Sequence, residues 1–414
     1  MDPPQTQPAP SVERLVLFFS GDTLGSLKPC GCSGGQLGGL EKRPAIFSEV
    51  PASERLLLDT GSLVEGDREQ DLIKFRILFR AFSLLGYDAI GLTQRDVEIA
   101  ESLGLIAGQQ HPFAIIGSDG EQTGVERPAS FSRSFRLNGG ELAVNVAAFD
   151  ARSDTAERAA ELFASAPRDW RLNVLILHNS DPGSVLPWTQ ASGADCIVCT
   201  STTDEPQQLS EHGARPLVFT VGRFGRHLCR VRVALSAAGT PTLEWTDISV
   251  TEDLPDEPAL AQLYRQYQQI VSDSNLLENY PRVPLPDGLR YAGSKSCQPC
   301  HLYEYTLWGS KAHASAFATL VEVGSDRDPE CVICHVVGMD RESGFISAQR
   351  TPGLKDVGCE VCHGPGSQHN ASQGLALTVE PKVACLDCHT PEKSSGYAGH
   401  EEEYLEKITH WWEP

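Results

Sequence analysis

Long hydrophobic runs are missing from this chain of 414 residues, although 40% of its residues are hydrophobic. No apolar stretch approaches the length of a membrane-spanning helix, so we expect no membrane span. The start of the sequence has neither the basic nor the apolar segment of an export signal. Positive charge is also scarce, because 34 Lys and Arg residues stand against 55 Asp and Glu residues, a formal net charge of −21. Nucleic acids and anionic lipid surfaces are therefore poor partners, and a basic protein surface is a better one.

A phosphate-binding loop is missing as well. Residues 34–39 are rich in glycine, but the Lys and Ser/Thr that grip phosphate in such loops are absent. We also find no pattern of residues typical of general acid–base or nucleophilic catalysis. The residues that carry chemistry in this chain are cysteine and histidine.

Four copies of Cys-x-x-Cys-His lie in the last quarter of the chain. The two thiols of each copy can form thioethers with the two vinyl groups of one haem, and the next imidazole then reaches the iron as proximal ligand. Paired cysteines can also bind zinc, but zinc does not need a His after every pair. We therefore expect four covalently bound haem c groups. Their predicted ligands are Cys297, Cys300, His301, Cys331, Cys334, His335, Cys359, Cys362, His363, Cys385, Cys388 and His389.

Attachment of haem c takes place outside the bacterial inner membrane, so the motifs predict a periplasmic or extracellular protein. An export signal would then have been removed or replaced, and residues 1–12, which are rich in proline, are expected to be a flexible leader. Five cysteines lie outside the motifs. In an oxidising compartment they favour disulfides or buried thiols, with a thiolate metal site as the alternative, and their odd number leaves at least one free. These residues are Cys30, Cys32, Cys196, Cys199 and Cys229.

Residues 13–254 alternate short apolar runs with segments of helical spacing, which predicts a layered α/β domain. Helices are expected at 71–85 and 155–164. A further helix and a Pro-rich linker, 255–290, precede a haem region at 291–414. The expected strands are 15–19, 56–59, 89–92, 113–116, 142–147, 174–177, 196–198, 217–221 and 228–233.

Short polar motifs at the predicted strand ends carry a resemblance, and they lie at 21–25, 59–62, 91–96, 177–179 and 221–226. Their order is similar to that in calcineurin-like metallophosphoesterases, above all the 5′-nucleotidase branch, which implies a site for two metal ions. Asp22 and His178 match two of the ligands of that family, but one Asp and one His cannot offset the charge of two divalent ions. We therefore expect an inactive scaffold for docking or assembly, with an active phosphoesterase as the weaker alternative. The positions that depart from the family pattern are Leu24, Ser62, Gln94, Arg95 and 199–203.

The haem region carries a second resemblance. Tyr291 and Gly293 before the first motif, Trp308 after it, and the segments 357–369 and 404–410 look like the tetrahaem cytochromes that accept electrons from hydroxylamine oxidoreductase. This resemblance implies a mostly α-helical, haem-packed domain that carries single electrons. It also implies three haems with two His ligands each and a five-coordinate second haem, which here would be the one bound by His335.

Histidines outside the motifs are scarce in this region, so each is a candidate sixth ligand. We expect His313, His369 and His410 to be distal ligands, with His400 as a possible one. Met339 lies too close to His335 in sequence to cross the ring and is expected to pack, whereas His400 or His111 could close the open haem. Two alternatives remain: a reductase that acts on a small ligand at the open haem, and self-association into an oligomer or haem filament. The redox partner is a protein that the sequence does not identify.

Overall fold

The computed structural model describes residues 11–12, 14–29, 34–117, 128–137, 140–165, 171–181, 183–235, 240–378, 385–390, 393–394 and 396–411. The chain divides into two compact units, Met1–Lys28 with Leu37–Tyr264 and Pro29–Gln36 with Arg265–Pro414. The division falls inside a helix that the sequence analysis had placed with the linker. It also assigns the short segment Pro29–Gln36 to the second unit, although both of its sequence neighbours belong to the first.

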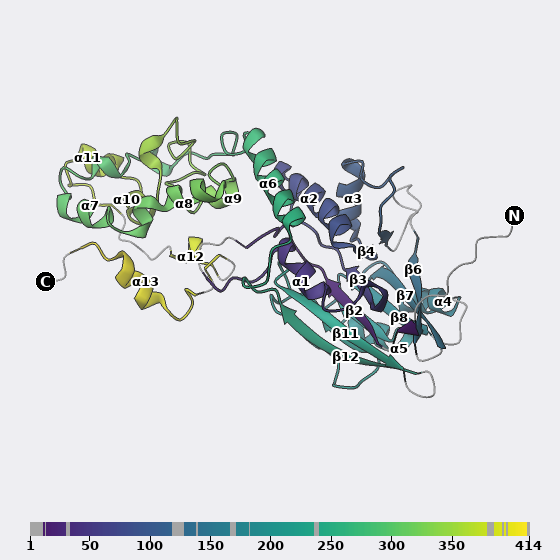
Figure 1. The fold of residues 1–414 in the computed structure, drawn as a ribbon. Coiled ribbons are helices and arrows are strands. Elements are labelled where there is room, and N and C mark those ends of the chain that lie inside the picture. Colours follow the sequence, from purple (N-terminus) through teal and green to yellow (C-terminus); the bar gives the residue numbers. More distant parts are fainter. Residues whose placement is uncertain are drawn as a thin grey trace. The chain divides into compact units, whose positions relative to one another are not determined.

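Two six-stranded sheets form the centre of the first unit (Figure 1). In one sheet β2, β3, β4 and β5 are parallel, and β11 adds to β2 in antiparallel register with Cys229 opposite Phe19. The order of its strands is β12 (Pro241–Ser249), β11 (His227–Leu235), β2 (Leu15–Ser20), β3 (Arg55–Asp59), β4 (Ala89–Gly91) and β5 (Ala114–Ile116).

The second sheet is also mostly parallel, with β7, β8, β9 and β10 running in one direction and β6 antiparallel to β7. Its edge strand β1 pairs with β6 in parallel. The order of its strands is β1 (Ser11–Val12), β6 (Ser130–Leu137), β7 (Gly140–Asp150), β8 (Arg171–His178), β9 (Cys196–Cys199) and β10 (Leu217–Thr220).

The main hydrophobic core lies between the two sheets, because alternate side chains of both enter one cluster that includes Leu17, Leu58, Val146 and Ile176. Helices cover the outer faces. α2 (Glu69–Leu85) buries one stripe of its surface and ends at Gly86, whose φ of 75° is left-handed. On the other sheet, α4 (Ala156–Ala164) and α5 (Val185–Ala191) enclose a second apolar cluster. The result is the four-layer arrangement that buries both sheets (Figure 1).

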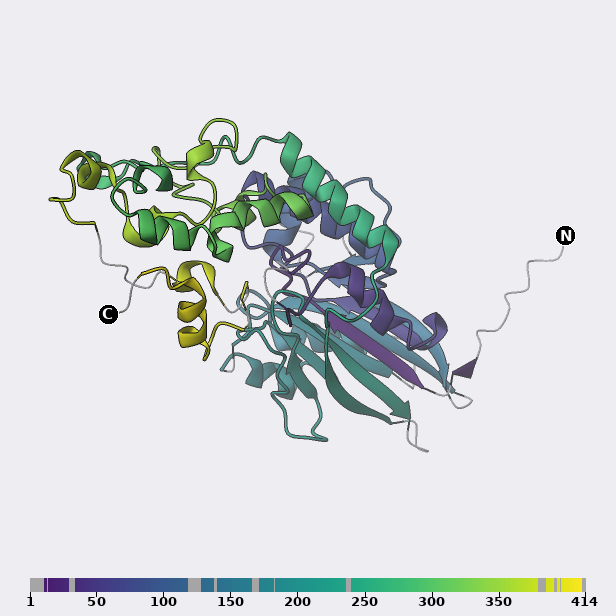
Figure 2. The same cartoon turned by 60° about the vertical axis from the view of Figure 1, so that its left-hand side comes forward.

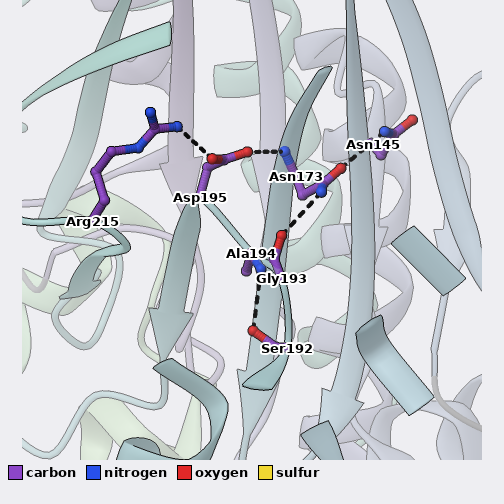
Figure 3. A network of polar contacts seen from close by, with 7 residues as sticks. All are labelled: Asn145, Asn173, Ser192, Gly193, Ala194, Asp195 and Arg215. Carbon is purple, nitrogen blue, oxygen red and sulfur yellow. Dashed lines mark hydrogen bonds and ion pairs between the residues drawn. The ribbon is translucent and has the colours of Figure 1, made fainter. Parts of the chain in front are cut away.

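A polar network links β7 and β8 of the second sheet to the residues just before β9 and β10 (Figure 3). Asn145 Nδ2 donates to Asn173 Oδ1 at 3.0 Å, and Asn173 Nδ2 donates to the carbonyl oxygen of Gly193 at 3.0 Å. Asp195 accepts a bond from the backbone nitrogen of Asn173 and forms an ion pair with Arg215. Buried amides are costly unless they are paired, so this network favours one register of β7, β8 and β9.

The predicted α/β architecture is confirmed, since all nine expected strands and the helices near 71–85, 155–164 and 255–274 are present. The third of these helices is α6 (Pro258–Asp273). The expected flexible leader differs from the structure at its end, because Ser11–Val12 form β1, while residues 1–10 lie outside the described part. The sequence analysis missed β6, β12, α1 (Arg43–Phe47), α3 (Gln94–Ser102) and α5.

The second unit consists mainly of short helices joined by turns (Figure 2). Its apolar cluster is small and includes Leu277, Phe317, Leu320, Val336 and Phe345. Within the described residues, no helix is both long enough and apolar enough to cross a membrane. The helices after α6 are α7 (Leu302–Trp308), α8 (Ala316–Val323), α9 (Pro329–Val332), α10 (Cys359–His363), α11 (Ser367–Ala371), α12 (Cys385–Cys388) and α13 (Glu401–Ile408).

Candidate haem-binding site

Three of the four Cys-x-x-Cys-His motifs include a short helix. α10 and α12 begin at the first cysteine of their motifs, and α9 contains Cys331. One helical turn brings the two thiols of a motif to the same side, which suits attachment to one porphyrin edge. The carboxylate of Glu360, inside the third motif, is buried and accepts bonds from the backbone nitrogens of Ala292, Gly293 and Gly366. This carboxylate therefore fixes the third motif against the segment that precedes the first.

The structure also brings motifs together in pairs. The thiols of Cys297 and Cys359 lie close enough to shift each other's pKa, which places the first motif beside the third. The thiols of Cys334 and Cys388 are close in the same sense, which places the second motif beside the fourth. Residues far apart in sequence thus form two groups of two attachment sites.

Each of the three predicted distal histidines has its ring near that of a different motif histidine. The ring centroids of His301 and His369 are 6.0 Å apart, and those of His313 and His389 are 6.3 Å apart. The third pair, His363 and His410, also shows a separation of 6.3 Å. A metal–imidazole bond is about 2 Å long, so two rings that bind one iron from opposite sides have centroids about 6 Å apart. The residues present therefore fit haem with two axial histidines.

Hydrogen bonds orient several of these rings. The Nδ1 atoms of His335, His369 and His410 bond to the carbonyl oxygens of Ala316, Ala376 and Ile408 at 2.6, 2.8 and 2.9 Å. Nδ1 of His389 bonds to the hydroxyl of Ser394 at 3.1 Å. An Nδ1–H that donates to oxygen fixes the tautomer and leaves Nε2 with a free lone pair for a metal ion.

Burial keeps the imidazoles in the form that binds metal. Loss of solvent lowers the pKa of His335 and His389, and the pKa of His313 is lowered first by burial and then by the nearby imidazoles. The pKa of His363 is lowered by the same causes. Neutral imidazole is the ligand for iron, so these rings need not lose a proton at neutral pH.

His335 differs from the other motif histidines, because among the described residues no ring contact joins it to another histidine. His400 is largely exposed and its Nδ1 lies 3.5 Å from the carboxylate of Glu403. His111 packs on Phe113 in the first unit and bonds to the carbonyl oxygen of Leu105 at 2.6 Å. These surroundings do not favour either residue as a sixth ligand. Met339 is 1% exposed within the apolar cluster of the second unit, which confirms that it packs.

In the first unit, the two residues that match phosphoesterase ligands form hydrogen bonds with backbone groups of the protein. Asp22 is buried, which raises the pKa of its carboxyl group, and Oδ2 accepts a bond from the backbone nitrogen of Ser201 at 2.9 Å. Nε2 of His178 bonds to the carbonyl oxygens of Thr60 and Gly91 at 2.9 and 3.1 Å. A nitrogen that donates to carbonyl groups has no lone pair for a metal ion.

A third acidic residue near these strand ends, Asp96, is also fully engaged. Its carboxylate accepts bonds from the backbone nitrogens of Ser62, Leu63 and Thr93 at 2.8–3.0 Å, and from the Thr93 hydroxyl at 2.7 Å. Within the part of the chain that the structure describes, no group of three or more His, Cys, Asp and Glu side chains is arranged to hold a metal ion.

The loops around this region keep an unusual backbone. Several residues other than glycine have positive φ angles between 44° and 62°, a region that is strained for side chains with a Cβ atom and is common at binding sites. They coincide with the motifs that carry the phosphoesterase resemblance. These residues are Asp22, Leu24, Ser62, Asn179 and Phe224.

The remaining cysteines of the first unit are buried thiols. Cys196, Cys199 and Cys229 are free, and burial raises the pKa of all three, that of Cys199 to about 11. Of the two expected states, disulfides or buried thiols, the structure describes these three residues as buried thiols. Cys30 and Cys32 lie outside the described residues.

Comparisons with known proteins agree with these two descriptions. Residues 296–364 match the family of cytochrome c554 and c-prime. Cytochrome c-554 of Nitrosomonas europaea is 34% identical over 91 residues, which cover 18% of this chain and 39% of that protein. The chain therefore spans well under half of the curated relative that it matches. Its C-terminal part is similar to these c-type cytochromes, and the resemblance predicted from its motifs is confirmed.

The fold of the first unit is similar to that of solved phosphoesterases. The calcineurin-like phosphoesterase YfkN from Bacillus subtilis has 15% identity and a TM-score of 0.50, covering 62% of this chain and 97% of that structure. A 5′-nucleotidase precursor from Thermus thermophilus has 14% identity and a TM-score of 0.50, covering 75% of this chain and 68% of that structure. At such identities the likeness shows the fold alone, and it confirms the predicted phosphoesterase-like architecture.

Sequence reasoning missed the residues that surround the motifs. Ser394 and Lys393 follow the fourth motif closely, and the hydroxyl of Ser394 orients His389. Glu360 lies between the two cysteines of the third motif, and its hydrogen bonds to the segment before the first motif were not predicted. The short distance in sequence between Ser394 and the motif was a usable signal, since partners of ligating histidines are often nearby hydroxyl or carbonyl groups.

Proposed function

We propose that this protein is a tetrahaem c-type cytochrome that carries single electrons in the periplasm or outside the cell. Bound haem supplies reversible one-electron chemistry of iron. The protein's own part is to anchor each group through two thioethers and one proximal histidine, at the four motifs named above. The observation that carries the proposal is the spacing of 6.0–6.3 Å between three motif histidines and three histidines outside the motifs.

In this proposal each distal histidine has a defined partner. His369 serves the first motif, His410 the third and His313 the fourth. Two axial histidines favour lower reduction potentials than a His and a Met. Cys297 is close to Cys359, which supports a close approach of the first haem to the third. Cys334 is close to Cys388, which supports a close approach of the second haem to the fourth.

We further propose that the first unit is an inactive relative of the phosphoesterases. Asp22, His178 and Asp96 are committed to backbone groups, which supports a role in docking a redox partner or in assembly rather than in catalysis. A redox protein of unknown identity and further copies of this chain, including a haem filament, are the candidate partners. In the proposed domain organisation the phosphoesterase-like domain spans 13–254 and the cytochrome domain 291–414.

The proposal is tested on the full chain produced with its haem attachment machinery. A pyridine haemochrome assay and an iron determination should each give four per chain. Electron paramagnetic resonance of the oxidised protein should show three low-spin haems with two histidine ligands. Incubation with manganese and a generic phosphate ester should give no turnover. Fewer than four haems per chain would reject the electron-carrier assignment, and phosphatase activity lost in Asp22→Ala would reject the inactive first unit.

A second function is favoured by His335. No described histidine lies opposite its ring, while its Nδ1 is held by Ala316 at 2.6 Å, so Nε2 can bind an iron whose other face is open. Such an iron could bind and reduce a small ligand such as a nitrogen oxide. Carbon monoxide should then bind the reduced protein at one haem in four. If the oxidised protein shows four low-spin haems and carbon monoxide does not bind, this second function is excluded.

A further inference from the structure

The turn that follows the fourth motif contacts two motifs at once. The backbone nitrogens of Lys393 and Ser394 donate to the carbonyl oxygen of Thr390 at 3.0 and 2.7 Å, which closes the turn. From this turn the hydroxyl of Ser394 bonds to Nδ1 of His389, the proximal histidine of the fourth motif. The same turn therefore positions a proximal ligand and presents the side chain of Lys393.

The ammonium group of Lys393 points to the second motif. Nζ lies 3.8 Å from Sγ of Cys334, and Lys393 is only half buried, so its charge does not have to be neutralised. Its positive charge acts on both motifs. It adds to the lowering of the pKa of the Cys334 thiol, and it opposes the larger rises that burial causes at Cys331 and that the contact with Cys334 causes at Cys388. Asp387 acts on Cys334 and Cys388 in the opposite sense and more weakly. Lys393 and Asp387 thus place opposite charges near the second and fourth motifs.

The backbone of Lys393 is held by a residue from far away in the sequence. Nε2 of Gln36 donates to the carbonyl oxygen of Lys393 at 2.7 Å, and Gln36 is 5% exposed. Gln36 belongs to the segment Pro29–Gln36, which groups with the second unit although its neighbours in sequence belong to the first. A buried amide that donates to a turn fixes the backbone from which the lysine side chain extends.

We propose that Lys393 is an electrostatic tuning residue for the haems of the second and fourth motifs, and that Gln36 is its positioning residue. This inference rests on the proposed function, since it requires haem at both motifs. Reduction removes one positive charge from a haem, so a fixed ammonium group nearby favours the reduced state. The two haems near Cys334 and Cys388 therefore have higher potentials with Lys393 than without it.

The test is a spectroelectrochemical titration of the holoprotein. In Lys393→Gln, two of the four haems should shift to lower midpoint potential, with the ratio of reduced to oxidised haem at a fixed potential falling about three- to tenfold. At about 59 mV per decade, this is roughly 30–60 mV. Lys393→Arg should keep the parent potentials, whereas Asp387→Asn should raise the same two. Gln36→Ala should lower them by a smaller amount, because the charge is kept but its position is not.

Lys407→Gln is the matched control, since Lys407 is an exposed lysine on α13 that pairs with Glu403 at 2.7 Å. It should leave the potential of the haem at the second motif, which Lys393 contacts, unchanged. Unshifted potentials in Lys393→Gln, or the same shift in Lys393→Arg, would overturn the tuning role, and unshifted potentials in Gln36→Ala would overturn the positioning role. A change of haem spin state in Lys393→Gln would also overturn the tuning role. Such a change would mean that the amine of Lys393 binds iron directly in the parent protein.

The haem content distinguishes a failure of this inference from a failure of the proposed function. A variant that keeps four haems per chain and its Soret spectrum but shows no shift counts against this inference alone. A parent protein with fewer than four haems counts against the proposed function itself. If Lys393→Gln does not bind four haems, Asp387→Asn still tests the electrostatic inference, because its predicted shift in potential has the opposite sign.

Discussion

The imidazole rings of His313 and His389 have centroids 6.3 Å apart, although one lies between the first two haem motifs and the other ends the fourth. His389 is oriented by Ser394, and His313 stands on a short 3-10 helix, Ala312–Ser315, before α8. Their separation matches two ligands of one iron, so a change at either ring should be visible at the fourth motif alone.

Replacement of His313 by alanine should convert one haem from low spin to high spin and leave the others unchanged. The reason is the loss of the sixth ligand opposite His389. Electron paramagnetic resonance of the oxidised protein measures the change. His400→Ala is the matched control and should have no effect, because His400 is exposed and lies beside Glu403. An unchanged spectrum for His313→Ala would contradict the pairing.

A chain produced without haem attachment should fold only in its first unit. That unit has an extensive core between two sheets, whereas the apolar cluster of the second unit is small and is surrounded by short helices. A segment of this size cannot bury enough apolar surface by itself. Limited proteolysis should therefore remove the C-terminal part from the haem-free chain and spare it in the holoprotein. Equal protection of both units without haem would contradict this expectation.

Asp96→Ala should lower the free energy of unfolding of the first unit by about 2 to 4 kcal/mol. The carboxylate satisfies three backbone nitrogens and one hydroxyl, and its removal leaves buried donors without partners. Calorimetry of the full chain can follow the transition of this unit. Asp253→Ala, at an exposed position of the same unit, should be neutral. Equal stability of the two variants would show that Asp96 is dispensable.

The thiols of Cys196, Cys199 and Cys229 should not react with a thiol reagent until the protein is unfolded. Burial raises their pKa values, that of Cys199 to about 11, so they remain protonated at neutral pH. The measurement uses a Cys30→Ser, Cys32→Ser background and compares native protein with denatured protein. Three thiols should react in denaturant and none without it.

The same shifts predict a loss of stability in alkali. The pKa of Cys199 is higher in the folded protein than in the unfolded chain, where it is near 9, so the folded state holds its proton more tightly. Its contribution to stability is complete below about pH 9 and is lost as the pH rises towards 11. Cys199→Ala should reduce the fall in stability over this range. An identical pH profile in the variant would contradict the assigned shift.

Most features that could be predicted from the sequence follow from patterns of residues close together in the chain. The haem motifs and the buried strands are readable because their spacing is fixed by thioether chemistry and by the sheet. Other helices and strands were missed because the same residues also fitted another interpretation or were not buried. Thr93 and Asp96 form a capping box for α3, with the backbone nitrogen of Asp96 bonded to the Thr93 hydroxyl at 3.1 Å, but the segment was interpreted as a degenerate metal motif. β12 was missed because most of its residues are at least partly exposed.

Long-range contacts could not be predicted in the same way. The choice of His313, His369 and His410 as distal ligands followed from composition and resemblance, but their assignment to particular motifs needed the fold. The bond between Gln36 and Lys393 had no signal in the sequence, because a glutamine in a glycine-rich stretch has many possible partners.

The segment Pro29–Gln36 makes the chain hard to divide. Because it leaves the first unit and the chain returns to that unit at Leu37, a cut near Arg265 does not release an intact second half. A fragment that starts there would have four haem motifs but no Gln36 beneath the turn at Lys393. The two units therefore do not correspond to two uninterrupted stretches of sequence, and a fragment that begins near Arg265 lacks part of its own unit.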